Sequence, residues 1–245
     1  MANLPNNNFT TNTLSLHAGY EYDRQRTLSV PIYQSTAYSF ENAEQAAARF
    51  SLEELGNIYS RLTNPTVDML AKRIAAVEGG AFGVATASGS SAVFYSLVNL
   101  AQNGDNIAYS NKIYGGSQTL LVHVLKRFGI EGRVFDIDNL SSLEKIIDDK
   151  TKAIFFESLS NPQIAIADVE TITNIAKKHK IVTICDNTVA TPILFRPFDF
   201  GVDVSVHSLT KYINGHGSGL GGAVIEREGL NELIKDNSRY PVFNT

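Results

Sequence analysis

Residues 82–110 read FGVATASGSSAVFYSLVNLAQNGDNIAYS. The apolar run 82–87 predicts a short strand, and residues 89–101, with Gly104 just past their end, predict a helix. Residues 106–110 then predict a second strand. A strand, a helix and another strand in this order form the unit from which parallel sheets are built.

The same alternation continues downstream of this segment. Further strand-type runs occupy residues 133–137, 153–157, 182–186, 202–206 and 221–225, and helical patterns occupy residues 117–128, 140–148 and 168–179. Strands that alternate with helices predict an α/β fold, with a mainly parallel sheet and helices on both of its faces.

The first part of the chain follows a different pattern. Residues 1–38 contain several Asn, Pro and Gly but no sustained apolar period, which predicts an extended arm. Helices are predicted over residues 41–55 and 64–78. We therefore expect residues 1–60 to be an arm and helix that contact a neighbouring subunit, and residues 61–245 to form a large domain.

Composition excludes several classes of protein. The chain has 245 residues, 43% of them hydrophobic, which is enough for a sizeable core. A net charge of −4 without any block of like charges argues against nucleic acid as a partner. The single cysteine, Cys185, excludes a disulfide scaffold or a Cys-rich metal site. Without a signal peptide or an apolar segment of membrane-spanning length, we expect a soluble, cytoplasmic protein that contacts no membrane.

Polar residues follow several predicted strands, at the sheet edge where open α/β sheets bind ligands. Small residues that open a helix favour a phosphate there, and they are Ser88, Gly89 and Ser90. Asp186 ends another strand, and residues 207–211, HSLTK, follow a third. Each feature alone has a simpler explanation, as a helix cap, a turn, a buried histidine or a surface lysine.

Taken together, these residues suit pyridoxal phosphate. The cofactor needs a lysine amine for a Schiff base with its aldehyde and a carboxylate beside its pyridine nitrogen. Lys211 and Asp186 match these two needs. The phosphate needs N–H and hydroxyl donors, for which the candidates are Gly89, Ser90, Ser208 and Thr210. We expect no metal at the site.

A competing pattern is G-x-G-x-x-G at residues 217–222, which is typical of dinucleotide-binding proteins. It precedes the strand at 221–225, whereas a dinucleotide site requires it between a strand and a helix. We interpret it as a chance match whose glycines let the backbone pass close to the cofactor side of the sheet.

Six segments carry a resemblance to a known family: PIYQST (31–36), YSR with NPT (59–61 and 64–66), YGG (114–116), SNP (160–162), DNT (186–188) and SLTKY (208–212). On these segments the chain, from His17 onward, resembles the Cys/Met-metabolism enzymes that use pyridoxal phosphate. The resemblance implies an aspartate-aminotransferase-like fold (type I), with residues 61–245 as the cofactor-binding large domain. Family members continue into a smaller C-terminal domain that supplies an arginine for the substrate carboxylate, and we expect that domain to be absent from this chain.

The resemblance also implies a role for each matching residue. Lys211 is the Schiff-base lysine, Asp186 pairs with the ring nitrogen, and Tyr114 stacks on the ring and assists proton transfer. Tyr59 and Arg61 reach the cofactor phosphate of the neighbouring subunit, which implies a dimer with shared sites, within a homotetramer. The remaining implied contacts are Asn161 with the substrate carboxylate, Thr188 near Asp186, and Ser88 with the cofactor.

Within the family, the segments LHAG (16–19), GNIYSR (56–61) and GHG (215–217) resemble the O-acetylhomoserine sulfhydrylase branch. Gly116 stands where the methionine-degrading lyases usually place Cys. The implied activity is γ-replacement on O-acetyl-L-homoserine by sulfide or methanethiol. The alternatives are a cystathionine γ-synthase or γ-lyase of the same family, and a non-catalytic fragment of such an enzyme.

Overall fold

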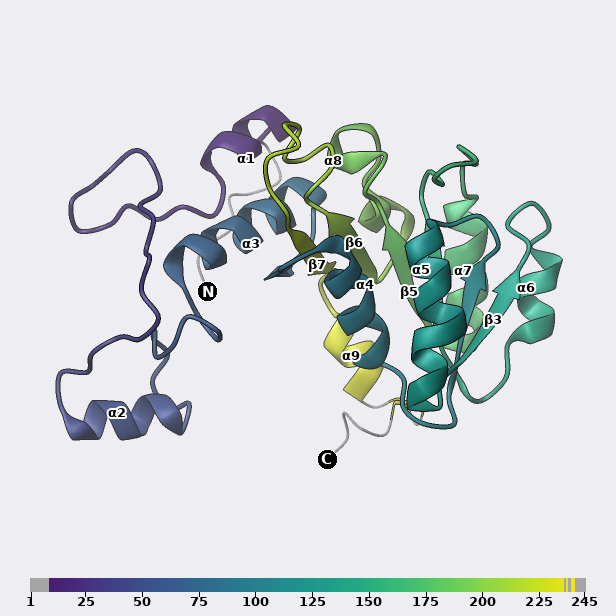
Figure 1. The fold of residues 1–245 in the computed structure, drawn as a ribbon, viewed down its shortest axis with the longest axis horizontal. Helices are drawn as coiled ribbons and strands as arrows, with labels where there is room; N and C mark the ends of the chain where they lie inside the picture. Colours follow the sequence, from purple (N-terminus) through teal and green to yellow (C-terminus); the bar gives the residue numbers. More distant parts are fainter. Residues whose placement is uncertain (1–8, 236, 238, 241–245) are drawn as a thin grey trace. The chain divides into compact units, whose positions relative to one another are not determined.

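The computed structural model describes residues 9–235, 237, 239 and 240 (Figure 1). The chain divides into two compact units, Met1–Arg73 and Ile74–Thr245. Helix α3 (Pro65–Glu78) begins in the first unit and ends in the second. The predicted subunit contacts of residues 1–60 stay a prediction.

The first unit contains a helix where an extended arm is predicted. Helix α1 (Thr11–His17) starts after Thr10, whose hydroxyl accepts a hydrogen bond from the Thr13 N–H at 3.4 Å. None of its residues is buried. The helix therefore has no buried face, and the sequence has no apolar periodicity that would predict it. Helix α2 (Ala43–Phe50) is shorter than the predicted 41–55. It ends at Phe50, and Leu52 beyond it has a left-handed φ of 62°, which is incompatible with a continued helix.

The second unit is built on a seven-stranded sheet with the strand order β1-β7-β6-β5-β4-β2-β3. Strand β7 runs in the opposite direction to the other six strands of this sheet, so the mainly parallel sheet is confirmed. The strands are β1 (Phe82–Thr86), β2 (Asn106–Ser110), β3 (Glu131–Phe135), β4 (Thr151–Glu157), β5 (Val182–Asp186), β6 (Val204–Ser208) and β7 (Gly222–Glu226).

Helices connect these strands. The predicted helix at 117–128 is a continuous helical segment that changes from α5 through a π-helical turn, η1, to a 3₁₀ turn, η2. The short elements α8, η3 and α9 are not predicted from the sequence. The helical elements of this unit after α3 are α4 (Gly89–Val98), α5 (Gly115–Thr119), η1 (Leu120–Val124), η2 (Leu125–Phe128), α6 (Ser141–Ile146), α7 (Val169–His179), α8 (Thr191–Leu194), η3 (Pro197–Phe200) and α9 (Leu230–Lys235).

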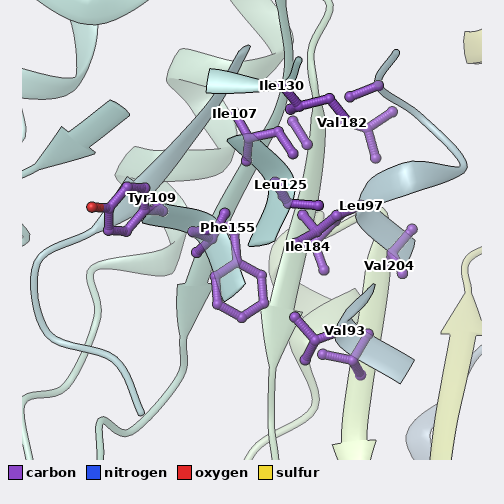
Figure 2. Packing of buried hydrophobic residues seen from close by; sticks show 14 of the residues in the cluster. Val93, Leu97, Ile107, Tyr109, Leu125, Ile130, Phe155, Val182, Ile184 and Val204 are labelled. Carbon is purple, nitrogen blue, oxygen red and sulfur yellow. The ribbon is translucent and has the colours of Figure 1, made fainter. Parts of the chain in front are cut away.

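Both faces of the sheet are covered by apolar side chains. In the fully buried strand β4, Phe155 packs in a cluster with residues of α4, η1 and η2, part of which Figure 2 shows. Its neighbour Phe156 packs with residues of α6 and α7 on the opposite face. This alternation is the two-residue period of a strand, and it confirms the expected helices on both faces.

Strand β6 differs from the prediction in a way that affects the site. It covers Val204–Ser208, two residues later than the predicted 202–206. The Asp203 carboxylate accepts hydrogen bonds from the Thr183 N–H and from the Arg227 Nε, both at 2.8 Å, so pairing with β5 begins only at Val204. His207 therefore lies inside the strand and does not follow it. Strand β3 is displaced in the opposite direction and begins two residues before the predicted 133–137.

The glycine-rich pattern at 217–222 lies directly before β7, as the sequence indicates, and not between a strand and a helix. Its last residue, Gly222, brings two segments into close contact, because a Cβ there would lie 2.1 Å from the Ser88 carbonyl oxygen. This supports the interpretation as a point of close backbone approach for Gly222, whereas a Cβ on Gly217 would have no heavy atom within 4 Å.

Candidate active site

Three neighbouring strands end in polar residues at the same edge of the sheet. Glu157, Asp186 and Ser208 are the last residues of β4, β5 and β6, and the register places Glu157 beside Asp186. Because these strands are adjacent and parallel, the three residues lie together at the carboxyl edge. Ligands of open α/β sheets bind at this edge.

Asp186 is held by the residues around it. Its carboxylate accepts hydrogen bonds from the Thr188 N–H at 3.0 Å and the Thr188 hydroxyl at 2.5 Å. That hydroxyl accepts a further bond from the Ser208 N–H at 2.8 Å, so Thr188 ties the end of β5 to the end of β6. Burial raises the pKa of Asp186 above its ordinary value. A cation such as a protonated ring nitrogen would stabilise this buried carboxylate.

The start of helix α4 packs against the end of β6. Ser88 is the N-cap, and its hydroxyl accepts a hydrogen bond from the Ser91 N–H at 3.1 Å. Gly89 contacts Ser208 so closely that a Cβ on Gly89 would lie 2.5 Å from the Ser208 Cβ. The first N–H groups of a helix have no partner within it, so Gly89 and Ser90 begin a segment suited to a phosphate.

Lys211 follows β6 by three residues, in a turn where its N–H donates to the Ser208 carbonyl at 3.2 Å. Its side chain is exposed, and within the described residues its Nζ has no hydrogen bond or ion pair in the structure. The hydroxyl of Thr210 is already engaged, because it accepts from the Gly221 N–H at 3.1 Å and lies 3.2 Å from the Gly221 carbonyl. The predicted phosphate contact of Thr210 stays a prediction.

Tyr114 and Asn161 come from different loops and share one buried partner. The Tyr114 N–H donates to Glu157 Oε1 at 2.6 Å, and the Asn161 N–H donates to Oε2 of the same carboxylate at 3.0 Å. Burial and the neighbouring Asp186 raise the pKa of Glu157 to about 7. Glu157 ends a predicted strand but is not among the residues predicted for the site, although Asp186 is predicted from the same kind of position.

His207 lies on the opposite face of the sheet from Ser208, because successive strand residues alternate. It is buried, and its Nε2 lies 3.0 Å from Glu78 Oε1. Ser205 and Asn187 donate to the same Glu78 oxygen, at 2.6 Å and 3.1 Å. This cluster accounts for the burial of His207 on the face away from Ser208, although among the described residues its Nδ1 has no hydrogen-bond partner.

Tyr59 and Arg61 belong to the first unit. The Arg61 guanidinium carbon lies 4.7 Å from the centroid of the Tyr59 ring, a distance typical of a cation–π contact. Their expected contact with a cofactor phosphate of a neighbouring subunit stays a prediction.

The carboxyl edge fits pyridoxal phosphate better than it fits a metal. It offers the Lys211 amine, the Asp186 carboxylate and a helix, α4, whose first residue is a glycine. These are groups that this cofactor needs. Among residues 9–235, 237, 239 and 240, no cluster of three His, Cys, Asp or Glu side chains could hold a metal ion. The described helices also include none that is long and apolar enough to cross a membrane.

Fold and site together define a pyridoxal-phosphate enzyme of the type I class. Residues 12–239 match the family described as Cys/Met metabolism PLP-dependent enzyme, and the chain belongs to this family. The resemblance drawn from the six sequence segments is therefore confirmed.

Two curated relatives with named activities are similar to this chain. The O-acetyl-L-homoserine sulfhydrylase of Corynebacterium glutamicum is 44% identical over 94% of this chain and 53% of its own length. The L-methionine gamma-lyase of Fusobacterium nucleatum is 39% identical over 91% of this chain and 57% of its own length. The chain thus spans about half the length of the curated relatives it matches.

A solved structure is more similar still. The crystal structure of a putative O-acetylhomoserine (thiol)-lyase from Campylobacter jejuni superposes with a TM-score of 0.95 at 69% identity, covering 96% of this chain and 58% of that one. That structure contains N'-pyridoxyl-lysine-5'-monophosphate.

Proposed function

We propose that the protein containing this chain replaces the γ-substituent of O-acetyl-L-homoserine with a sulfur nucleophile. Sulfide gives homocysteine and methanethiol gives methionine, with acetate released in both reactions. One observation carries the proposal: Asp186, Ser208 and the start of α4 meet at one sheet edge, with Lys211 just beyond it. The sulfhydrylase relatives, 41–45% identical to this chain, support the reaction class.

Pyridoxal phosphate, when bound, supplies an aldehyde that reacts with amines and a ring that accepts electrons. The Lys211 amine would hold this aldehyde, and the same amine, when free, would move protons at the substrate Cα and Cβ. Asp186 keeps the ring nitrogen protonated by its charge, and Thr188 orients the Asp186 carboxylate.

The remaining residues bind and orient. The N–H groups of Gly89 and Ser90 bind the phosphate at the start of α4. The Tyr114 ring stacks on the cofactor, and Asn161 contacts the substrate carboxylate. Further phosphate contacts are assigned to Ser88, Ser208, Thr210 and, from a neighbouring subunit, Tyr59 and Arg61.

Gly116 favours replacement over the γ-elimination of the methionine gamma-lyase relative. A Cβ at Gly116 would lie 2.4 Å from Cε1 of the Tyr114 ring, so any side chain there would displace that ring. The glycine therefore leaves Tyr114 in a position that a cysteine would change. Elimination remains the second candidate because of the 39% identity to that lyase.

The proposed assembly is a dimer with shared active sites, within a tetramer, in the cytoplasm. The dimer follows from the assignment of Tyr59 and Arg61 to a neighbouring site. Its direct test, subunit complementation, is given among the predictions below.

The proposed function is tested with the complete purified protein and O-acetyl-L-homoserine. Sulfide, methanethiol and cysteine are compared as nucleophiles, and methionine is offered as a substrate for elimination. Faster turnover with cysteine would identify a cystathionine γ-synthase instead, and turnover by the 245-residue chain alone would exclude a non-catalytic fragment.

Borohydride reduction followed by peptide mapping tests the lysine assignment in the same preparation. We expect the label on Lys211. A label on Lys72, Lys112 or Lys235 would refute the assignment.

A further inference from the structure

The carboxylate of Glu157 has no part in the reaction proposed above, yet it binds two residues that do. Its side chain is buried, with the residue 5% exposed. Oε1 accepts from the Tyr114 N–H at 2.6 Å and Oε2 accepts from the Asn161 N–H at 3.0 Å. Both hydrogen bonds are accepted by a carboxylate. Hydrogen bonds in which one partner is charged are the strongest class in proteins.

These two bonds link loops that come from different strands. Tyr114 follows β2, and Asn161 follows β4. The Tyr114 residue is 51% exposed and Asn161 is exposed as well, so side-chain packing within the described residues does little to hold either one. Strands β2 and β4 are paired neighbours in the sheet, and beyond their ends the shared carboxylate is a direct contact between the two loop backbones.

We propose that Glu157 is a positioning residue whose carboxylate holds the Tyr114 ring and the Asn161 side chain at a fixed spacing around the cofactor. The inference rests on the proposed function, which assigns Tyr114 to the cofactor ring and Asn161 to the substrate. In this proposal Glu157 acts through Tyr114 and Asn161 and is given no contact of its own with the cofactor or the substrate.

Replacement Glu157→Gln tests this role because an amide has one acceptor oxygen and one NH₂ donor. It can serve only one of the two N–H groups, and its own donor faces the other. Asp105→Asn is a matched control, because Asp105 is also a buried carboxylate that accepts from a backbone N–H, that of Gln102 at 2.9 Å. Asp105 precedes β2 and thus lies at the amino edge of the sheet.

The measurements use the complete protein loaded with pyridoxal phosphate, without substrate, in the same weakly alkaline buffer for every variant. Amide hydrogen exchange is followed in the peptides that contain Tyr114 and Asn161, together with the visible circular dichroism of the cofactor. For Glu157→Gln we expect about tenfold faster exchange in at least one of the two peptides and weaker dichroism, and in separate kinetics a larger rise in KM than fall in kcat. Asp105→Asn should leave these peptides and the dichroism unchanged.

Wild-type exchange in both peptides of a folded Glu157→Gln protein would overturn the proposal, because loss of one acceptor oxygen would then leave both loops unaffected. If Glu157→Gln does not fold, Glu157→Asp replaces it. The shortened carboxylate cannot reach both N–H groups, so one peptide at least must exchange faster, and unchanged exchange in both would refute the role. If the wild type does not turn over O-acetyl-L-homoserine, but Glu157→Gln differs from it in exchange as expected, only the proposed function is refuted.

Discussion

The close contact between Gly89 and Ser208 makes Gly89→Ala a sharp test of how the site is assembled. An added Cβ would lie 2.5 Å from the Ser208 Cβ and 2.7 Å from its Cα. Carbon atoms in contact prefer about 3.5–4.0 Å, so the start of α4 and the end of β6 must separate by about 1 Å. Overpacking of this kind costs about 1–3 kcal/mol in the free energy of unfolding. The gain from replacing a helical glycine with alanine offsets at most about 1 kcal/mol of that cost.

The same displacement moves the first N–H groups of α4 away from any phosphate that Ser208 also contacts. Loss of one hydrogen bond to a charged group corresponds to about a tenfold weaker affinity or more. We therefore expect Gly89→Ala to lower the urea midpoint of the cofactor-free protein and to raise the Kd for pyridoxal phosphate, measured by absorbance titration.

Gly115→Ala is the matched control for stability. No heavy atom lies within 4 Å of a Cβ built on Gly115, and it stands at the start of helix α5. This variant should be as stable as the wild type or slightly more so. A Gly89→Ala protein with wild-type stability and wild-type cofactor affinity would show that the contact with Ser208 does not position the start of α4.

Three further outcomes follow from the site. Asp186→Asn should fold normally and lose most turnover of O-acetyl-L-homoserine, because an amide cannot hold the ring nitrogen protonated by charge; near-wild-type turnover with cofactor bound would assign that role to another group. In the cofactor-free protein, the free energy of unfolding should fall as the pH rises from the ordinary pKa of a glutamate, 4.5, through about 7, because the folded state keeps a proton on Glu157 that the unfolded chain has released. Glu157→Gln should remove this part of the pH dependence in urea unfolding series, and an unchanged slope would mean that Glu157 does not titrate there. Mixing Arg61→Ala with Lys211→Ala subunits should restore activity, because a mixed dimer contains one site with both residues intact; no recovery despite subunit exchange, verified by mass spectrometry of tagged chains, would place Arg61 outside the neighbouring site.

Several local features could be predicted from the sequence because they depend on residues close together in the chain. Strands 106–110 and 182–186 have the predicted bounds in the structure, since each is a short apolar run between polar residues. The position of Asp186 at the end of its strand follows from the same pattern. The family could be identified because its motifs are short, ordered segments that need no knowledge of which strands are neighbours.

Only the tertiary structure brings the site residues to their partners. The sequence places Glu157 and Asp186 at strand ends, but it does not state that β4 and β5 are adjacent or that these two carboxylates share a register. Likewise, His207 pairs with Glu78 across 129 positions of sequence, and Gly89 contacts Ser208 from another element. Apolar periodicity encodes which face of a strand is buried, whereas strand order and register arise from the packing of the whole sheet. For this reason the sequence could nominate the chemical groups of the site, whose roles stay predictions, but not the hydrogen bonds that Glu157 accepts from Tyr114 and Asn161.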